Sequence, residues 1–85
     1  MVHIPSPLRS YTAGAAKVPA DGATLADVLA SLEGRFGGIR FRVVDEQSRI
    51  RPHIRFYVNA REAMELSEPV DAGAAVHVVC ALSGG

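Results

Sequence analysis

The sequence predicts a single α+β domain in which one helix packs across one face of a small mixed sheet. Three observations lead to this prediction. The 85 residues allow one core built from two layers and no more. Alternating strand patterns stand near both ends of the chain, and a capped amphipathic helix stands between them. The order of strand, strand, helix and further strands is typical of an α+β fold.

The N-terminal part of the chain predicts two short strands. Val2 and Ile4 alternate with His3, which is the period of a strand with one buried face. Residues 5–7, Pro-Ser-Pro, then end this strand. Residues 17–19, Lys-Val-Pro, predict a second, brief strand at a sheet edge, because proline cannot donate to an interior ladder.

The main helix is predicted to begin after Thr24 and to run for about three turns. Residues 24–27 place an acid three residues after the threonine, which is a capping-box arrangement. The apolar side chains that follow recur at helical spacing and form one stripe: Leu25, Val28, Leu29, Leu32 and Phe36. Gly34 weakens the end of this helix, and Gly37 with Gly38 terminates it.

The middle of the chain predicts one clear strand between irregular segments. Residues 39–53 show no clean period, and 45–48 are predicted to form a turn. Residues 53–59 alternate apolar and polar side chains, which predicts a central strand. Residues 60–75 are predicted to be mostly irregular, with a short strand at 64–66.

The last strand is predicted over residues 76–82. One set of its side chains faces the helix and the other faces away: Val76, Val78, Cys80 and Leu82 against His77, Val79 and Ala81. Residues 83–85, Ser-Gly-Gly, have nothing to pack against. We therefore expect a domain over residues 1–82 and a flexible tail over residues 83–85.

Composition excludes several classes of function. Nine Lys and Arg balance nine Asp and Glu, which argues against general nucleic-acid binding. Cys80, the single cysteine, cannot form an internal disulfide and is expected to be a small buried hydrophobe. No stretch approaches the roughly 18 apolar residues of a membrane span, and the N-terminus lacks a signal-peptide core. We expect a cytoplasmic protein without membrane partners and, because no catalytic motif is present, not an enzyme.

Two further patterns leave alternatives open. His3, His53 and His77 each lie on the polar side of a predicted strand, where they form either a metal site or, as we favour, three solvated or partly covered surface imidazoles. Residues 35–61 carry seven arginines against two acids, whereas residues 62–85 carry four acids and no base. The acidic segment either steers a basic partner near the tail or is a solvated surface.

The Gly84-Gly85 pair is the sharpest feature of the sequence. Glycine makes up about 7% of average protein sequences, so a terminal pair arises by chance only rarely. The pair follows a well-patterned strand with only Ser83 between them. Because glycine lacks a Cβ atom, such a tail can enter a narrow tunnel and present its carboxylate to another enzyme.

Five segments, taken in order and spacing, carry a resemblance to a known family. They are I-P-S-P-L-R, T-L-A-D-V-L-A-S-L, G-I-R-F-R-V-V-D-E, R-P-H-I-R-F-Y-V-N and V-H-V-V-C-A-L-S-G-G. This pattern resembles the MoaD/ThiS family of ubiquitin-like sulfur carriers, and within it the branch with the cysteine-biosynthesis carrier and bacterial ubiquitin-like small modifiers. The resemblance implies a β-grasp fold. The chain departs from the family at residues 71–74, where a D-G-D turn is frequent, and at Cys80 and Ala81, where a proline is common.

The resemblance also implies a chemistry for the tail. A ubiquitin-activating-type enzyme would use ATP to adenylate the Gly85 carboxylate, and sulfur would then displace AMP to give a thiocarboxylate. Gly84 would be the spacer that lets the tail thread. The nucleotide would belong to the activating enzyme, so no cofactor or metal is expected on this chain. The first expected sulfur acceptor is a cysteine synthase. The second is the large subunit of a molybdopterin synthase, in which case this chain would be the small subunit.

A docking surface and two other functions complete the expectations. Arg55, Tyr57, Val79 and Ala81 are expected to line the sheet face opposite the helix, with Leu82 near the tail. This face is either a partner-binding patch or simply a mixed surface. The alternative to sulfur transfer is a protein modifier joined through Gly85 to lysines of target proteins. A third alternative is a passive interaction module in which the diglycine is incidental.

Overall fold

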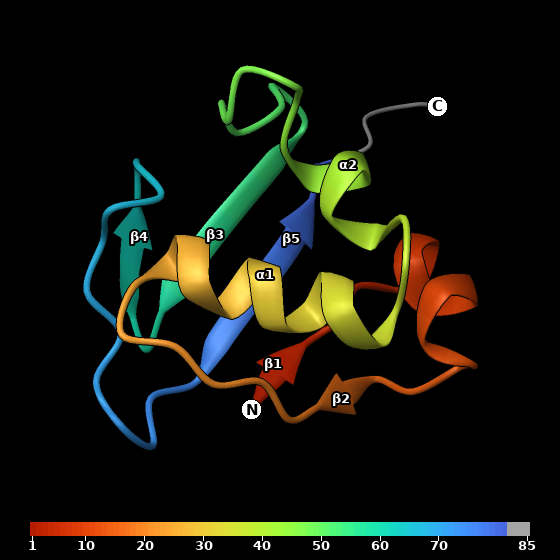
Figure 1. Cartoon of the computed structure of the whole chain (residues 1–85), viewed down its shortest axis with the longest axis horizontal. Helices are drawn as coiled ribbons and strands as arrows, with labels where there is room; N and C mark the ends of the chain where they lie inside the picture. The colour runs from red at the N-terminus through yellow and green to blue at the C-terminus, as the bar shows by residue number, and fades with distance from the viewer. Residues whose placement is uncertain (82–85) are drawn as a thin grey trace.

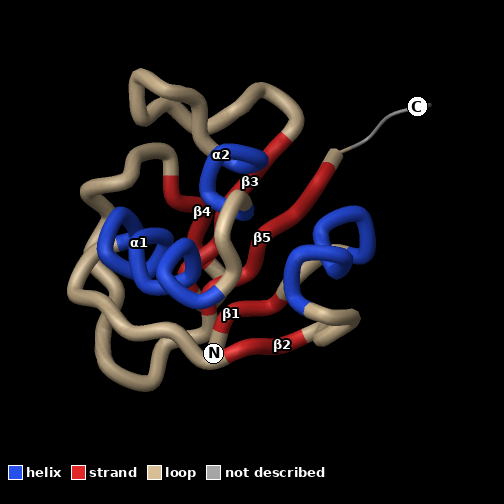
Figure 2. The backbone as a smooth tube through the Cα atoms, turned by 45° about the vertical axis from the view of Figure 1, so that its right-hand side comes forward, coloured by secondary structure: helices blue, strands red, loops and turns tan. Residues whose placement is uncertain are grey.

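The computed structural model describes residues 1–81 and shows a five-stranded mixed sheet with two helices on one face (Figures 1 and 2). The strand order is β2-β1-β5-β3-β4; β1 and β5 run parallel and the other pairs run antiparallel. The elements are β1 (Val2–His3), η1 (Ser6–Thr12), β2 (Lys17–Val18), α1 (Leu25–Arg35), α2 (Ile39–Val43), β3 (Ile54–Val58), β4 (Arg61–Ala63) and β5 (Val76–Cys80). This arrangement confirms the predicted α+β class and the β-grasp fold. Within residues 1–81, no helix is long and apolar enough to cross a membrane.

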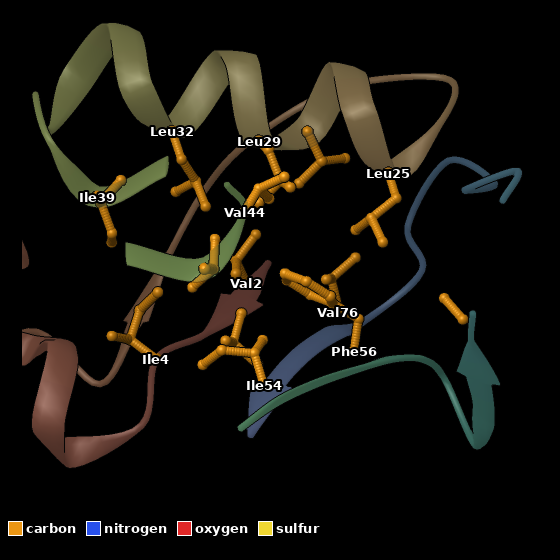
Figure 3. Close-up of a cluster of buried hydrophobic side chains, with 14 of the residues drawn as sticks. Val2, Ile4, Leu25, Leu29, Leu32, Ile39, Val44, Ile54, Phe56 and Val76 are labelled. Atoms are coloured by element: carbon orange, nitrogen blue, oxygen red, sulfur yellow. The ribbon is translucent and has the colours of Figure 1, made fainter. Parts of the chain in front are cut away.

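The core lies between the helices and the covered face of the sheet. Phe56 on β3 stands opposite Val78 on β5, and Val58 stands opposite Val76. Phe56 is fully buried, which is worth about 1.5–3 kcal/mol relative to an exposed side chain. Figure 3 shows the helices and strands directing their apolar side chains into this cluster, among them Val2, Ile4, Leu25, Leu29, Leu32, Ile39, Val44, Ile54, Phe56 and Val76.

Helix α1 forms as the sequence predicts. Thr24 has an extended backbone, and its hydroxyl oxygen accepts a hydrogen bond from the Asp27 N–H at 3.3 Å, so the predicted N-cap is present. The stripe residues Leu25, Val28, Leu29 and Leu32 are all buried. Phe36 follows the last helical residue, Arg35, and is partly buried against the core.

Helix α2 is the main element that the sequence did not predict, because its N-terminus is capped from another helix. The carboxylate of Glu33 in α1 accepts hydrogen bonds from the Gly38 and Arg40 N–H groups at 2.8 and 2.9 Å. These two bonds hold the pKa of Glu33 below its usual value. Gly38 has φ +98°, a conformation that favours glycine. Buried Ile39 and Val43 then join the core.

The turn predicted at residues 45–48 is confirmed. The Asp45 carboxylate accepts hydrogen bonds from the backbone N–H groups of Gln47 and Arg49, both at 2.9 Å. Such local side-chain to backbone bonds stabilise turns. Ser48 adopts a left-handed backbone with φ +62°.

The strand predicted at residues 64–66 is misplaced, because the observed strand lies immediately before these residues. The strand is β4 at Arg61–Ala63, since Val58 pairs directly with Arg61 across a two-residue turn. Asn59 makes this turn possible with φ +56°, and its side-chain oxygen accepts the Ala75 N–H at 3.0 Å. Met64 therefore leaves the sheet and is 71% exposed.

Three smaller differences concern the strand ends and η1. The predicted strands at both ends are present but shorter, because β1 stops at His3 and β5 stops at Cys80. Strand β3 is interior, while β5 holds the middle of the sheet. The Pro-Ser-Pro segment ends β1 as predicted, yet its prolines also start η1, in which Leu8 is buried. Proline suits this first turn because it lacks the N–H that would have no partner there.

Candidate docking site and tail attachment

The sheet face away from the helices carries the predicted docking residues side by side. Tyr57 on β3 pairs with His77 on β5, and Arg55 pairs with Val79. All four have the parity opposite to buried Phe56, so they project to the uncovered face. Val79 is 41% exposed, Arg55 is exposed and Tyr57 is partly buried. The structure thus brings together three of the predicted docking residues, Arg55, Tyr57 and Val79.

Arg55 is the one charged member of this group, and it is paired. Its guanidinium donates to a Glu62 carboxylate oxygen on β4 at 3.0 Å. Both side chains are accessible, so this ion pair adds little to stability. Its effect is to direct the Arg55 guanidinium toward edge strand β4.

The tail begins beside His53. Ala81 is exposed, and its N–H donates to the His53 carbonyl at 2.7 Å, one step beyond the end of β5. Ala81 is thereby held at the same end of the sheet as the start of β3. The predicted site residues Leu82, Gly84 and Gly85, and the expected domain limit at residue 82, lie outside the described residues.

Two of the three histidines meet, and the third does not. The rings of His3 and His77 stack on the open face with centroids 4.2 Å apart and planes 18° from parallel. Desolvation first, and then the charge of His77, lower the pKa of His3. His53 is an exposed residue before β3. Within residues 1–81, no group of three or more His, Cys, Asp or Glu side chains is placed so that it could hold a metal ion. His3 and His77 are partly covered, and His53 is exposed.

Cys80 agrees in part with the prediction of a small buried hydrophobe. It is partly buried and packs against the hydrophobic core. Burial raises the pKa of its thiol, which disfavours the reactive thiolate.

Basic rather than acidic side chains stand where the described chain ends. Phe41, Arg42, Arg51 and His53 together line a hollow of about 230 Å³, and it is His53 that bonds to Ala81. The acidic segment instead follows edge strand β4, which β3 separates from β5. The two alternatives for the acidic segment, steering of a basic partner near the tail and a solvated surface, stay predictions.

Comparison with known proteins places the chain in a family. The sequence pattern of the ThiS family matches residues 2–85. The chain belongs to the ThiS family. As a ThiS-type sulfur carrier, it is a carrier protein and not an enzyme.

Relatives of this ThiS-family chain carry two kinds of name. It is 35% identical to the sulfur carrier protein CysO of Mycobacterium tuberculosis over an alignment 89 residues long, which covers 99% of this chain and 96% of that protein. It is also 37% identical over 68 residues to small archaeal modifier protein 3 of Haloferax volcanii, covering 76% of this chain and 73% of that protein.

A solved structure supports the same assignment. The chain matches a structure of the BexX/CysO complex of Amycolatopsis orientalis with a TM-score of 0.91 and 33% identity, covering 99% of this chain and 97% of that chain. That relative of the ThiS-family chain thus assembles with another protein. The β-grasp fold and the family agree with the resemblance drawn from the sequence.

Proposed function

We propose that the chain carries sulfur as a thiocarboxylate on Gly85 and delivers it to a biosynthetic enzyme. The observation that carries this proposal is that the family match extends to residue 85 and so includes the Gly84-Gly85 pair. In this proposal residues 1–82 are the docking domain and residues 83–85 are the tail that enters the partner. Glycines suit that role because a side chain would collide with the walls of a narrow tunnel.

The chemistry needs one activating partner. A Gly85 carboxylate oxygen attacks the α-phosphorus of ATP in an adenylating enzyme of the ubiquitin-activating type, and pyrophosphate leaves. A hydrosulfide-level sulfur nucleophile then attacks the acyl carbon, and AMP leaves with the carboxylate oxygen. The product is a thiocarboxylate, whose sulfur is a nucleophile. ATP binds to the activating enzyme, and this chain contributes the carboxylate.

The part of the open sheet face formed by β3 and β5 is the proposed docking surface. Tyr57 and Val79 supply accessible aromatic and aliphatic area, and Arg55 supplies charge beside them. Aromatic and arginine side chains dominate the energetics of protein interfaces. Ala81 and Leu82, which precede the tail in the sequence, are the further docking residues in this proposal, so that docking and insertion of Gly85 occur together.

Intact mass tests the carrier proposal. The purified chain is incubated with ATP, a sulfur donor and its host's activating enzyme, and a variant without Gly85 serves as the control. We expect a gain equal to the mass difference between sulfur and oxygen in the full chain and no gain in the control. An unchanged mass, with an enzyme that is active on another carrier, contradicts the proposal.

Cysteine formation is the first pathway that we propose, since the chain aligns over 99% of its length with a sulfur carrier named CysO. Molybdopterin synthesis is the second. The thiocarboxylated chain is offered separately to a pyridoxal-phosphate cysteine synthase and to a molybdopterin-synthase large subunit. Consumption of the sulfur by the cysteine synthase is the expected result, and consumption only by the other enzyme reverses the order.

A protein modifier is the second candidate function, favoured by the identity with a small archaeal modifier protein. Gly85 would then form an isopeptide bond to lysines of target proteins. No Lys or Arg follows Arg61, so trypsin would leave the peptide from Glu62 to Gly85 on each modified lysine. Mass spectrometry of cellular lysines for this remnant decides between the candidates, because pure sulfur transfer predicts none.

A further inference from the structure

An arginine-rich surface beside the start of the tail is not used by the docking surface described above. Its members come from α2 and from the segment that leads into β3. They are Phe41, Arg42, Arg51 and His53, which line one hollow of about 230 Å³. We call this group the Phe41 surface. Figure 1 shows α2 at the same end of the molecule as the carboxyl end of β5.

Phe41 is 55% exposed, which is unusual for an aromatic side chain of a small domain. The Arg51 guanidinium lies over its ring, 4.6 Å from the centroid, and the Arg51 Nε donates to the Phe41 carbonyl at 2.8 Å. A cation stacked on a ring is held in place and remains accessible on its other side. The pair therefore offers a fixed aromatic surface with a positive charge.

The positive charge of this surface is not neutralised within the described chain. The two ion pairs formed among residues 1–81 engage Arg55 and Arg61, and neither Arg42 nor Arg51 takes part. The nearest acids in sequence are Asp45 and Glu46. The Asp45 carboxylate accepts two backbone N–H groups of its own turn, and the nearby charges of Arg49 and Arg51 help to lower its pKa without forming an ion pair within the described residues. Arg42 and Arg51 thus remain available to an acidic partner.

The length of the tail limits how far from this surface a partner that holds Gly85 can lie. Four residues follow Ala81, and four extended residues span at most about 14 Å. Ala81 is fixed by its hydrogen bond to His53, which is itself a member of the Phe41 surface. A partner active site that receives Gly85 therefore lies within reach of Phe41 and its two arginines.

We infer that the Phe41 surface docks an acidic rim around the tail-binding pocket of the activating enzyme. This inference rests on the proposed function. Both candidate functions require the activating enzyme, since sulfur transfer and conjugation share the activation step. Acidic side chains on the rim would pair with Arg42 and Arg51, and an apolar rim residue would cover Phe41. Such charges raise association rates and fix the orientation of docking.

Activation kinetics with a matched pair of charge reversals test the inference. Arg42 is exposed on α2. Lys17 is exposed on edge strand β2, which β1 separates from the docking residues on β5 and β3, and it does not line the hollow of the Phe41 surface. Arg42→Glu and Lys17→Glu change the net charge equally. For wild type and both variants, kcat and KM of ATP-dependent activation are measured at low and at raised salt, and thermal unfolding verifies the fold.

We expect Arg42→Glu to raise KM by about tenfold at low salt with kcat nearly unchanged, because a rim charge acts mainly on association. The KM of wild type should rise with salt, and that of Arg42→Glu should depend on salt less. Lys17→Glu should stay within about twofold of wild type. Equal KM values for the two variants overturn the inference while leaving the proposed function intact.

Two other outcomes also overturn the inference. If wild type is not activated at all, the proposed function fails and the inference fails with it. A fluorescent single-stranded RNA is titrated against the same proteins to test for a polyanion partner. If Arg42→Glu abolishes RNA binding but leaves activation at the level of Lys17→Glu, the surface binds nucleic acid and not the enzyme.

Discussion

The two faces of the sheet differ most clearly along β3, where adjacent residues have opposite environments. Phe56 is fully buried under the helices, whereas its neighbour Tyr57 lies on the open face, opposite His77 on one side and Glu62 on the other. Strand alternation makes this division possible within five residues. One strand therefore supplies both the core that fixes the domain and the surface that remains free for partners.

Phe56→Ala is expected to have the largest effect, because it opens a cavity at the centre of the covered face. Loss of a buried phenylalanine costs about 3–5 kcal/mol, a large share of the roughly 5–15 kcal/mol that stabilises a typical domain. Urea denaturation followed by circular dichroism measures the free energy of unfolding. A loss below about 1 kcal/mol would show that the covered face does not determine the stability of the domain.

Tyr57→Glu is expected to do the reverse, leaving the fold intact and impairing function. The new carboxylate faces Glu62, which Arg55 already neutralises, so we expect a stability cost below about 1 kcal/mol. Charge on the docking surface should lower kcat/KM for activation by about tenfold. Tyr57→Phe, which keeps the ring, is the control and should react like wild type. Equal kinetics for Glu and Phe variants would remove Tyr57 from the docking surface.

The same contrast between local and distant information explains which elements the sequence could predict. Helix α1 contains its own signals, with the Thr24 cap and the apolar stripe within one segment. Helix α2 has five residues, and its capping carboxylate, Glu33, belongs to α1. A pattern search within residues 39–53 cannot find a helix whose start is stabilised from outside that range.

The candidate site divides in the same way. The period of two in β3 and β5 places Arg55, Tyr57 and Val79 on one face from sequence alone. The Phe41 surface depends on tertiary contacts, since Phe41 and Arg51 are ten residues apart and meet only because α2 folds back. The meeting of His3 with His77 likewise requires the parallel pairing of the two terminal strands.

The smallest expected effect concerns this histidine pair and the pH dependence of stability. Desolvation, and then the charges of His77, Lys17 and the N-terminal amine, lower the pKa of His3. The unfolded chain, with an ordinary histidine pKa of about 6.5, therefore binds more protons than the folded chain near that pH. The free energy of unfolding therefore falls as the pH drops through about 6.5, because protonation of His3 is less favourable in the folded chain. Well above that pH His3 is neutral in both states, and this cost is absent.

His3→Phe tests this assignment, because phenylalanine keeps a flat ring against His77 but does not titrate. We expect the urea midpoint of wild type to fall more steeply than that of the variant between about pH 7.5 and pH 5.5. The carboxylates with lowered pKa values, Glu33 and Asp45, titrate below about pH 4.5 and do not enter this window. If the urea midpoints of the two proteins depend equally on pH, protonation of the stacked pair does not affect the stability of the fold.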